Sequence, residues 1–352
     1  MYQKFMHAWE RRCHDKDNNR VVRPFEWGLE FLSPNPVIHH GEANGAVQAV
    51  APLNQIEQFN ERVIPNSHEF YLPAPSQPED FDFDGFMLRF PSSITTISAA
   101  NNTVYARFYP AQKNGKESDR AVIVMPQWNG DVNAHVAICQ ALNKFGISAL
   151  RLSLPYHDWR KPPELERADY MVSANLGRTI QSVQQAVHDI RRSADWLQLH
   201  GIRSIGVMGT SVGSCVGFLA QIHDERLAVG VFNHVSCYFG DVVWQGITTH
   251  HIRQSLAENL TLEEARKAWL SISPSAYIPK LKGLKRKVKM IAGRYDLTFP
   301  FDLTQIVFDD CERHDVAFEK VILPCGHYTS GKAPFKFLDG YHIVSYFVKE
   351  LK

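Results

Sequence analysis

Short apolar runs alternate with helix-length segments along most of the chain. Residues 86–90 and 104–109 are typical of antiparallel leading strands. Six near-continuous apolar runs follow, as expected of parallel strands buried on both faces. They are AVIVM (121–125), ISALRLSL (147–154), SIGVMG (204–209), LAVGVF (227–232), VKMIAG (288–293) and EKVILP (319–324). The pattern therefore predicts a mostly parallel, eight-stranded sheet.

Helical patterns lie between these strands. Asp131 is the expected cap of a helix that reaches Phe145, Asn175 caps one that reaches about Leu199, and residues 212–223 form another. Strands and helices that alternate in this way imply right-handed crossovers. The sequence thus predicts an α/β fold, with a doubly wound sheet and helices on both of its faces.

Two segments do not fit the alternation. Residues 236–286 interrupt it after the sixth strand, and LTLEEARKAWLSI within them is helical in pattern. An insertion there would lie over the crevice at the carboxyl edge of the sheet, as a helical cap. Residues 1–84 begin with a helical pattern and continue with Pro-rich breaks at 33–36 and 74–78. We expect an N-terminal extension that wraps a catalytic domain of residues 85–352, the alternative being a flexible tail.

Composition narrows the function classes. The chain is 44% hydrophobic and 21% charged, which suits a large buried core, and its net charge of +1 argues against a nucleic-acid partner. No run of eighteen apolar residues predicts a membrane span, and the charged first residues argue against a secretory signal. Six cysteines without a C-x-x-C pair are expected to be reduced and mostly buried, which favours the cytoplasm. We make no prediction of the oligomeric state.

The pentapeptide Gly209-Thr210-Ser211-Val212-Gly213 joins the strand 204–209 to the helix 212–223. A serine in such a strand-turn-helix junction is typical of a nucleophile elbow, where small residues are needed two positions before and after it. The alternative is a chance match, which about one chain in ten of this length would contain. The strand and helix around it reduce that chance to about one in fifty. Ser211 is therefore the candidate nucleophile.

A serine hydroxyl needs a histidine base, which is oriented in turn by a carboxylate. Asp296 and His327 follow the last two predicted strands. Asp302 and Asp309 are alternatives to Asp296, but they fall in the helix that comes next. The pair His250-His251 could suggest a metal site; without acidic or thiol partners at ligand spacing, a surface role is favoured. We expect neither a metal nor an organic cofactor.

Three runs resemble the elbow, acid loop and histidine loop of α/β-hydrolases: GTSVGS, AGRYDLTFP and LPCGHYTSG. The resemblance covers roughly residues 85–350. It implies the α/β-hydrolase fold and Ser-His-Asp chemistry at Ser211, His327 and Asp296. The run LPYHDWRKP also resembles a little-characterised branch of these hydrolases, which assigns no substrate.

The attacked carbonyl also requires hydrogen-bond donors for its oxyanion. One is expected from the amide of Val212 and the other from the loop PQWNGD, which departs from the usual His-Gly beginning. Pro126 has no N–H, so Gln127 or Trp128 remains, with Trp128 favoured by register. Candidate pocket walls are Tyr156, His157, Trp159 and Trp244, although aromatic residues of this kind more often only pack.

The function that these residues predict is hydrolysis of a small-molecule carboxylic ester through an acyl-enzyme. Peptides, thioesters, lactones and acyl transfer would use the same triad, and a hydroxynitrile-lyase-like reaction would use it without acylation. A serine at 211 argues against dehalogenases and epoxide hydrolases, which use aspartate. From another class, the chain could be a catalytically silent binding module with this fold.

Overall fold

The computed structural model describes residues 1–32, 50–113 and 115–352. The strands are β1 (Asp82–Phe83), β2 (Met87–Pro91), β3 (Thr103–Tyr109), β4 (Gln112–Lys113), β5 (Lys116–Glu117), β6 (Arg120–Met125), β7 (Ser148–Leu152), β8 (Ser204–Thr210), β9 (Leu227–Asn233), β10 (Lys287–Gly293) and β11 (Glu319–Leu323). The helices are α1 (Tyr2–His14), α2 (Pro52–Val63), α3 (Ser67–Phe70), α4 (Val136–Lys144), α5 (Leu176–Leu199), α6 (Val212–His223), α7 (Phe239–Gln245), α8 (His250–Leu256), α9 (Leu262–Ala268), α10 (Phe301–Arg313) and α11 (Phe335–Glu350).

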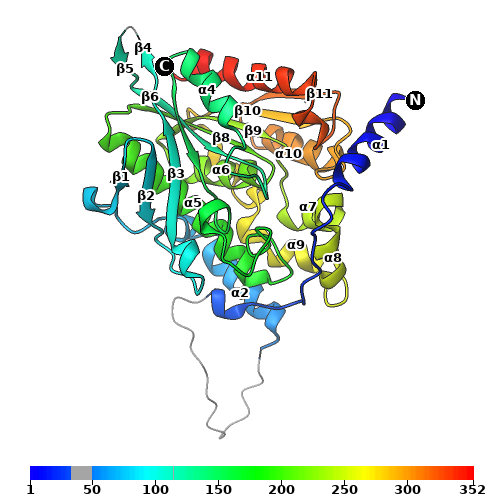
Figure 1. Ribbon diagram of the computed structural model, residues 1–352. Helices are drawn as coiled ribbons and strands as arrows, with labels where there is room; N and C mark the ends of the chain where they lie inside the picture. Colours follow the sequence, from blue (N-terminus) through cyan, green and yellow to red (C-terminus); the bar gives the residue numbers. More distant parts are fainter. Residues whose placement is uncertain (33–49, 114) are drawn as a thin grey trace, which may run out of the picture.

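The described residues form a nine-stranded sheet, ordered β1-β2-β3-β7-β6-β8-β9-β10-β11, and a separate two-stranded sheet of β4 and β5 (Figure 1). Neighbours from β7 to β11 run parallel, whereas β1, β2 and β3 are antiparallel to their neighbours. Both faces of the parallel strands β6 to β10 are buried, whereas the edge strand β11 is largely exposed. In β6, Ile123 packs in one core cluster with α5 and α6, and Val122 and Val124 pack in a second cluster with α4 and α11.

The predicted α/β class, all eight strands and the helix from Asn175 to Leu199 are confirmed. The Asn175 side chain accepts the N–H of Arg178 at 2.8 Å. The sheet has one strand more than predicted, because β1 is a two-residue edge strand that is too short to give a periodic pattern. The helix that was predicted to run from Asp131 to Phe145 does not begin at Asp131. The Asp131 side chain accepts the N–H of Asn133 within a turn, and α4 begins only at Val136.

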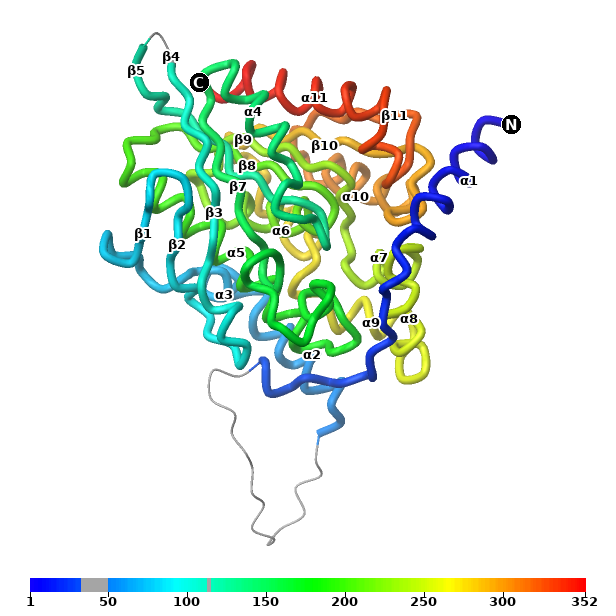
Figure 2. The backbone as a smooth tube through the Cα atoms, in the orientation of Figure 1, coloured from blue at the N-terminus to red at the C-terminus, as the bar shows by residue number. Residues whose placement is uncertain are grey.

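The N-terminal residues lie along the rest of the molecule (Figure 2). After α1, the chain passes α8, where the Ser255 hydroxyl donates to the carbonyl of Arg23 at 2.6 Å, and then reaches the start of α5, where Glu26 pairs with Asn175. The Asn60 amide of α2 donates to the carbonyl of Lys267, next to the end of α9. The Pro-rich residues 33–36 lie outside the described residues, and the division at residue 84 stays a prediction.

Within the described ranges, no helix combines the length and the apolar content that a membrane crossing needs. All six cysteines are free thiols, and every one except Cys13 is buried, as predicted.

Candidate active site

The sheet changes winding direction between β6 and β8. After β6 the chain continues to β7 on one side, and after β8 it continues to β9 on the other. At such a switch point the loops beyond the carboxyl ends of the strands separate and leave a crevice. A cavity of about 1250 Å³ lies here. It is lined by Gln127 and Trp128 after β6, Ser211 and Val212 after β8, and His327 after β11.

Ser211 occupies the sharp turn between β8 and α6. Its backbone angles are φ 59° and ψ −123°, a left-handed conformation that costs energy for a residue with a side chain. A Cβ on Gly209 would come 2.1 Å from the carbonyl oxygen of Gly213, and a Cβ on Gly213 would come 2.5 Å from that of Pro126. Glycine at both positions is therefore a steric requirement of this turn, which explains the spacing of the pentapeptide.

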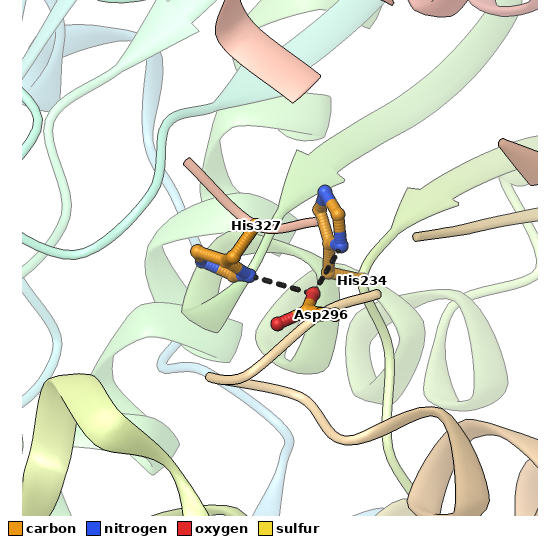
Figure 3. A group of neighbouring side chains, drawn as sticks. All are labelled: His234, Asp296 and His327. Carbon is orange, nitrogen blue, oxygen red and sulfur yellow. Dashed lines mark hydrogen bonds and ion pairs between the residues drawn. The ribbon is translucent and has the colours of Figure 1, made fainter. Parts of the chain in front are cut away.

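Asp296 and His327 come together at the carboxyl ends of β10 and β11. His327 Nδ1 lies 3.0 Å from Asp296 Oδ2 (Figure 3). The other carboxylate oxygen, Oδ1, accepts the backbone N–H groups of Thr298 and Phe299, both at 2.7 Å. Asp302 and Asp309, the alternatives to Asp296, lie on α10, as the sequence predicts. Of the three aspartates, Asp296 is the one that contacts His327.

The two groups stabilise each other's charged forms. Burial opposes ionisation of Asp296, but the charges of His327 and His234 and their hydrogen bonds outweigh it and hold the pKa of Asp296 well below its usual range. Burial likewise opposes a charge on His327, but the charge and hydrogen bond of Asp296, with a further contribution from Glu10, raise the pKa of His327. The arrangement therefore suits a histidine that accepts a proton during a reaction.

The loop after β6 is held from two sides. The backbone N–H of Asn129 donates to His157 Nε2 at 2.9 Å, and the Asn129 side chain accepts the N–H of Ala168 at 2.7 Å. The indole N–H of Trp128 donates to the carbonyl of Ala168 at 2.9 Å. Within the described ranges, the backbone N–H groups of Gln127 and Trp128 donate to no protein atom. They are thus available to a ligand in the cavity.

His157 can act as an acceptor here because it is neutral. Burial lowers its pKa to about 4, against smaller opposing effects of Pro155 and Asp158. Its Nδ1 lies 2.8 Å from the carbonyl of Pro155, so Nδ1 carries the proton and Nε2 the lone pair.

No family model matches the chain, and no curated protein matches it in sequence. Among solved structures, the acylaminoacyl peptidase of Pyrococcus horikoshii superposes with a TM-score of 0.57 and 14% identity, over 83% of this chain and 44% of the peptidase. The esterase Pf2001 of Pyrococcus furiosus superposes with a TM-score of 0.52 and 14% identity, over 80% of this chain and 98% of the esterase. Est1E from Butyrivibrio proteoclasticus, with ferulic acid bound, superposes with a TM-score of 0.52 and 14% identity, over 73% of this chain and 99% of Est1E. The chain has the α/β-hydrolase fold. It spans less than half of the peptidase's length.

His234 is a residue of this candidate site that was not predicted from the sequence. It follows β9 directly, and its Nδ1 lies 2.7 Å from the same Asp296 oxygen that His327 contacts (Figure 3). Its Nε2 lies 3.2 Å from the hydroxyl of Ser330. Its position at a strand end was a signal, which the sequence analysis used only for His327.

Two imidazoles and one carboxylate are also a donor set that suits zinc, and the donor atoms of His234, Asp296 and His327 lie within 4.8 Å of one another. However, His327 Nδ1 is hydrogen-bonded to Asp296 Oδ2, so this nitrogen carries a proton and has no lone pair for a metal, and His234 Nδ1 lies 2.7 Å from the same oxygen. The contact of His327 with Asp296 therefore fits a histidine anchored by a carboxylate better than a metal ligand.

Glu10 of α1 is a second missed residue. Its side chain is fully buried and accepts the backbone N–H groups of Tyr328 at 3.0 Å and Thr329 at 2.8 Å. A Cβ on Gly326 would come 2.3 Å from the Glu10 carboxyl carbon, so the loop lies directly against this side chain. The first helix thus holds the loop that carries His327. A single glutamate at the start of the chain gave no local signal of this contact.

The predicted pocket walls are only partly in place. Tyr156 and His157 line the cavity. Trp244 is not among the lining residues, because α7 turns Val242 and Val243 toward the cavity and leaves Trp244 under the guanidinium of Arg253, 5.6 Å from the ring centroid. Trp159 is 42% exposed and lies outside the lining.

The surface role expected for the His250-His251 pair is wrong for His251. His250 is exposed, but His251 is only 9% exposed and stacks on Trp128, with ring centroids 6.0 Å apart and an interplanar angle of 5°. Because α8 packs against the loop after β6, one histidine of the pair faces inward.

Proposed function

We propose that the chain is a serine hydrolase that cleaves a carboxylic ester, with Ser211 as nucleophile, His327 as base and Asp296 as the residue that orients the base. The observation that carries this proposal is the cavity at the switch point. It joins a serine in a strained turn to a histidine that is bound through Nδ1 to a buried carboxylate.

The reaction follows from the proton positions. Because His327 Nδ1–H donates to Asp296, Nε2 carries the lone pair and takes the proton of the Ser211 hydroxyl. The Ser211 oxygen attacks the ester carbonyl, and the amide of Val212, with that of Trp128 or Gln127, stabilises the oxyanion. The alcohol leaves with the proton from His327. Water, activated by the same histidine, then hydrolyses the acyl-enzyme and releases the acid.

An ester is the first choice because alcohols are better leaving groups than amines. Solved structures that share the fold include esterases and an acylaminoacyl peptidase, so amide, thioester and acyl-transfer reactions on the same triad are the alternatives. A panel of esters and amides of matched acyl groups decides among them. Turnover of the amides alone would contradict the ester proposal.

A fluorophosphonate probe tests the nucleophile. We expect the folded protein to be labelled at Ser211 and the Ser211→Ala variant to resist labelling. Thr95→Ala, which removes an exposed hydroxyl, is the matched control and should label normally. If the folded wild-type chain is not labelled, or if Ser211→Ala is labelled equally, the protein is a binding module or uses another nucleophile.

A further inference from the structure

Arg167 is a cationic residue in the wall of the cavity that the proposed reaction does not use. It is 7% exposed and lines the same cavity as Ser211. Its guanidinium lies over the indole of Trp128, 5.2 Å from the ring centroid. Because the amide of Trp128 is a proposed oxyanion donor, Arg167 is one side chain away from the place where the reacting carbonyl would bind.

The guanidinium of Arg167 is incompletely paired. Nη1 donates to the side-chain oxygen of Asn19 at 3.0 Å. Nε lies 3.5 Å from Asp169 Oδ1 without forming a hydrogen bond, and it is buried. Among the residues that the structure describes, Nη2 has no hydrogen-bond acceptor. Most donors of this planar group are therefore unused.

The carboxylate of Asp169, which lies at ion-pair distance from Arg167, is shared with another arginine. Asp169 Oδ2 accepts from both Nε and Nη2 of Arg23, each at 3.2 Å. The better geometry of that pair ties the carboxylate to Arg23, so a single negative charge faces two guanidinium groups. The surroundings of Arg167 thus keep a net positive charge.

His251 lies in the same positively charged surroundings. It stacks on the indole that Arg167 covers. Burial lowers the pKa of His251 to about 4, and the positive charges of Arg167, Arg20 and His14 act in the same direction. The acidic residues of the cavity wall compensate little. Five acidic residues line the described cavity: Asp17 pairs with Arg20, Asp158 pairs with Arg151, Asp339 accepts from the Asn233 amide, and Asp131 and Glu166 are exposed.

We propose that Arg167 binds a carboxylate carried by the substrate, beyond the oxyanion loop. This inference rests on the proposed serine hydrolase and names its substrate class: an ester that bears a free carboxylate, such as the half-ester of a dicarboxylic acid or the ester of a hydroxy acid. A guanidinium matches a carboxylate with two parallel N–H bonds, and burial strengthens that pair. The carboxylates of Asp17 and Glu166, which line the same cavity, favour a monoanion over a phosphate dianion.

Matched substrates test the proposal. Monoethyl succinate and ethyl succinamate differ only in a carboxylate against an uncharged amide, and acetoxyacetate and acetoxyacetamide place the same difference on the alcohol side. We expect kcat/KM to favour the carboxylate at least about tenfold in one of the two pairs, since hydrogen bonds to a charged group are worth that much. Acetoxyethyl phosphate is the phosphate arm. Faster turnover of that ester than of acetoxyacetate would overturn the choice of carboxylate.

Variants separate recognition from structural support. Arg167→Gln should lower kcat/KM for the carboxylate-bearing ester at least about tenfold more than for its uncharged partner, while Arg167→Lys should keep part of the preference. Arg253→Gln, which removes a guanidinium that covers Trp244 outside the cavity, is the matched control. If Arg167→Gln slows both esters equally, Arg167 only supports Trp128 and the proposal is wrong.

Binding distinguishes a failure of this inference from a failure of the proposed function. Calorimetric titration of acetoxyacetate and monoethyl succinate into Ser211→Ala needs no turnover. Binding that is at least about tenfold weaker when Arg167→Gln is added supports the site, even if the wild-type chain hydrolyses nothing. Equal binding with and without Arg167 overturns it, even if fluorophosphonate labels Ser211.

Discussion

Glu10 offers the sharpest perturbation of the histidine loop, because one side chain from the first helix holds two backbone N–H groups of that loop. Replacing it by alanine leaves both groups without an acceptor in a buried site. A hydrogen bond to a charged group contributes about 1.5–3 kcal/mol, so Glu10→Ala removes about 3–6 kcal/mol of local stabilisation. This loss cannot exceed the free energy at which α1 would detach from the loop. Glu10→Gln keeps one acceptor oxygen and therefore removes about half of this stabilisation.

Two measurements follow from these magnitudes. The amides of Tyr328 and Thr329 should exchange hydrogen at least about tenfold faster in Glu10→Gln and faster again in Glu10→Ala. Hydrolysis of a model ester should fall by about tenfold in Glu10→Gln and about a hundredfold in Glu10→Ala, because a displacement of the base by about 1 Å has an effect of that size. Glu30→Gln, the same change at an exposed position, is the control.

The pH profile separates positioning from general destabilisation. The negative charge of Glu10 contributes to the raised pKa of His327, which must be neutral to accept the serine proton. Removing that charge lowers the pKa of His327, so the acidic limb of kcat/KM should move to lower pH, by on the order of 0.5 pH unit. If Glu10→Ala retains the wild-type rate and the same acidic limb, the reasoning about this helix is refuted.

Three further changes probe the elbow, the oxyanion loop and the buried carboxyl of Asp339. Gly209→Ala should destabilise the fold by at least about 3 kcal/mol in urea unfolding, since its Cβ would meet backbone at 2.1 Å, whereas Gly331→Ala, with open space around it, should not. His157→Leu should lower kcat at least about tenfold with little change in KM, and His157→Gln, which restores an acceptor for Asn129, should recover part of it; an equal loss in both would contradict the acceptor role. Burial raises the pKa of Asp339 to about 6, so the native state holds this proton more tightly than the unfolded chain does, and stability falls as pH rises from about 4 to about 6. Asp339→Asn should therefore raise the free energy of unfolding by at most about 3 kcal/mol at pH about 8 and by much less at pH about 4. The same gain at both pH values would contradict a raised pKa of Asp339.

The sheet could be predicted from the sequence because its parallel strands, apart from the edge strand β11, are buried on both faces. That burial requires apolar residues at every position, so β6 and β8 stand out as continuous runs without any knowledge of their partners. The same logic fails where side-chain hydrogen bonds replace apolar packing. Asp131 looks like a helix cap by residue type, but its side chain closes a turn five residues before α4 begins.

The candidate triad was predictable for a related reason. Ser211, Asp296 and His327 each lie just beyond a recognisable strand, and the carboxyl ends of neighbouring parallel strands meet at one edge of the sheet. His234 also follows such a strand, so strand-end position alone did not distinguish the two histidines. The difference appears only in three dimensions, because His327 lines the cavity whereas His234 lies behind it against Asp296 and Ser330.

The groups that hold the candidate site come largely from segments outside the regular alternation of strands and helices. Glu10 in the N-terminal extension fixes the loop of His327, and His157 and Ala168, in the long connection from β7 to α5, fix the loop of Trp128. Arg167 lies in that same connection and is linked to Asn19 of the extension. Since the strand ends already supply the candidate triad, we expect these additions to determine how rigidly its groups are held and which charge a substrate would meet. The irregular segments are therefore where substrate specificity in this chain is expected to lie.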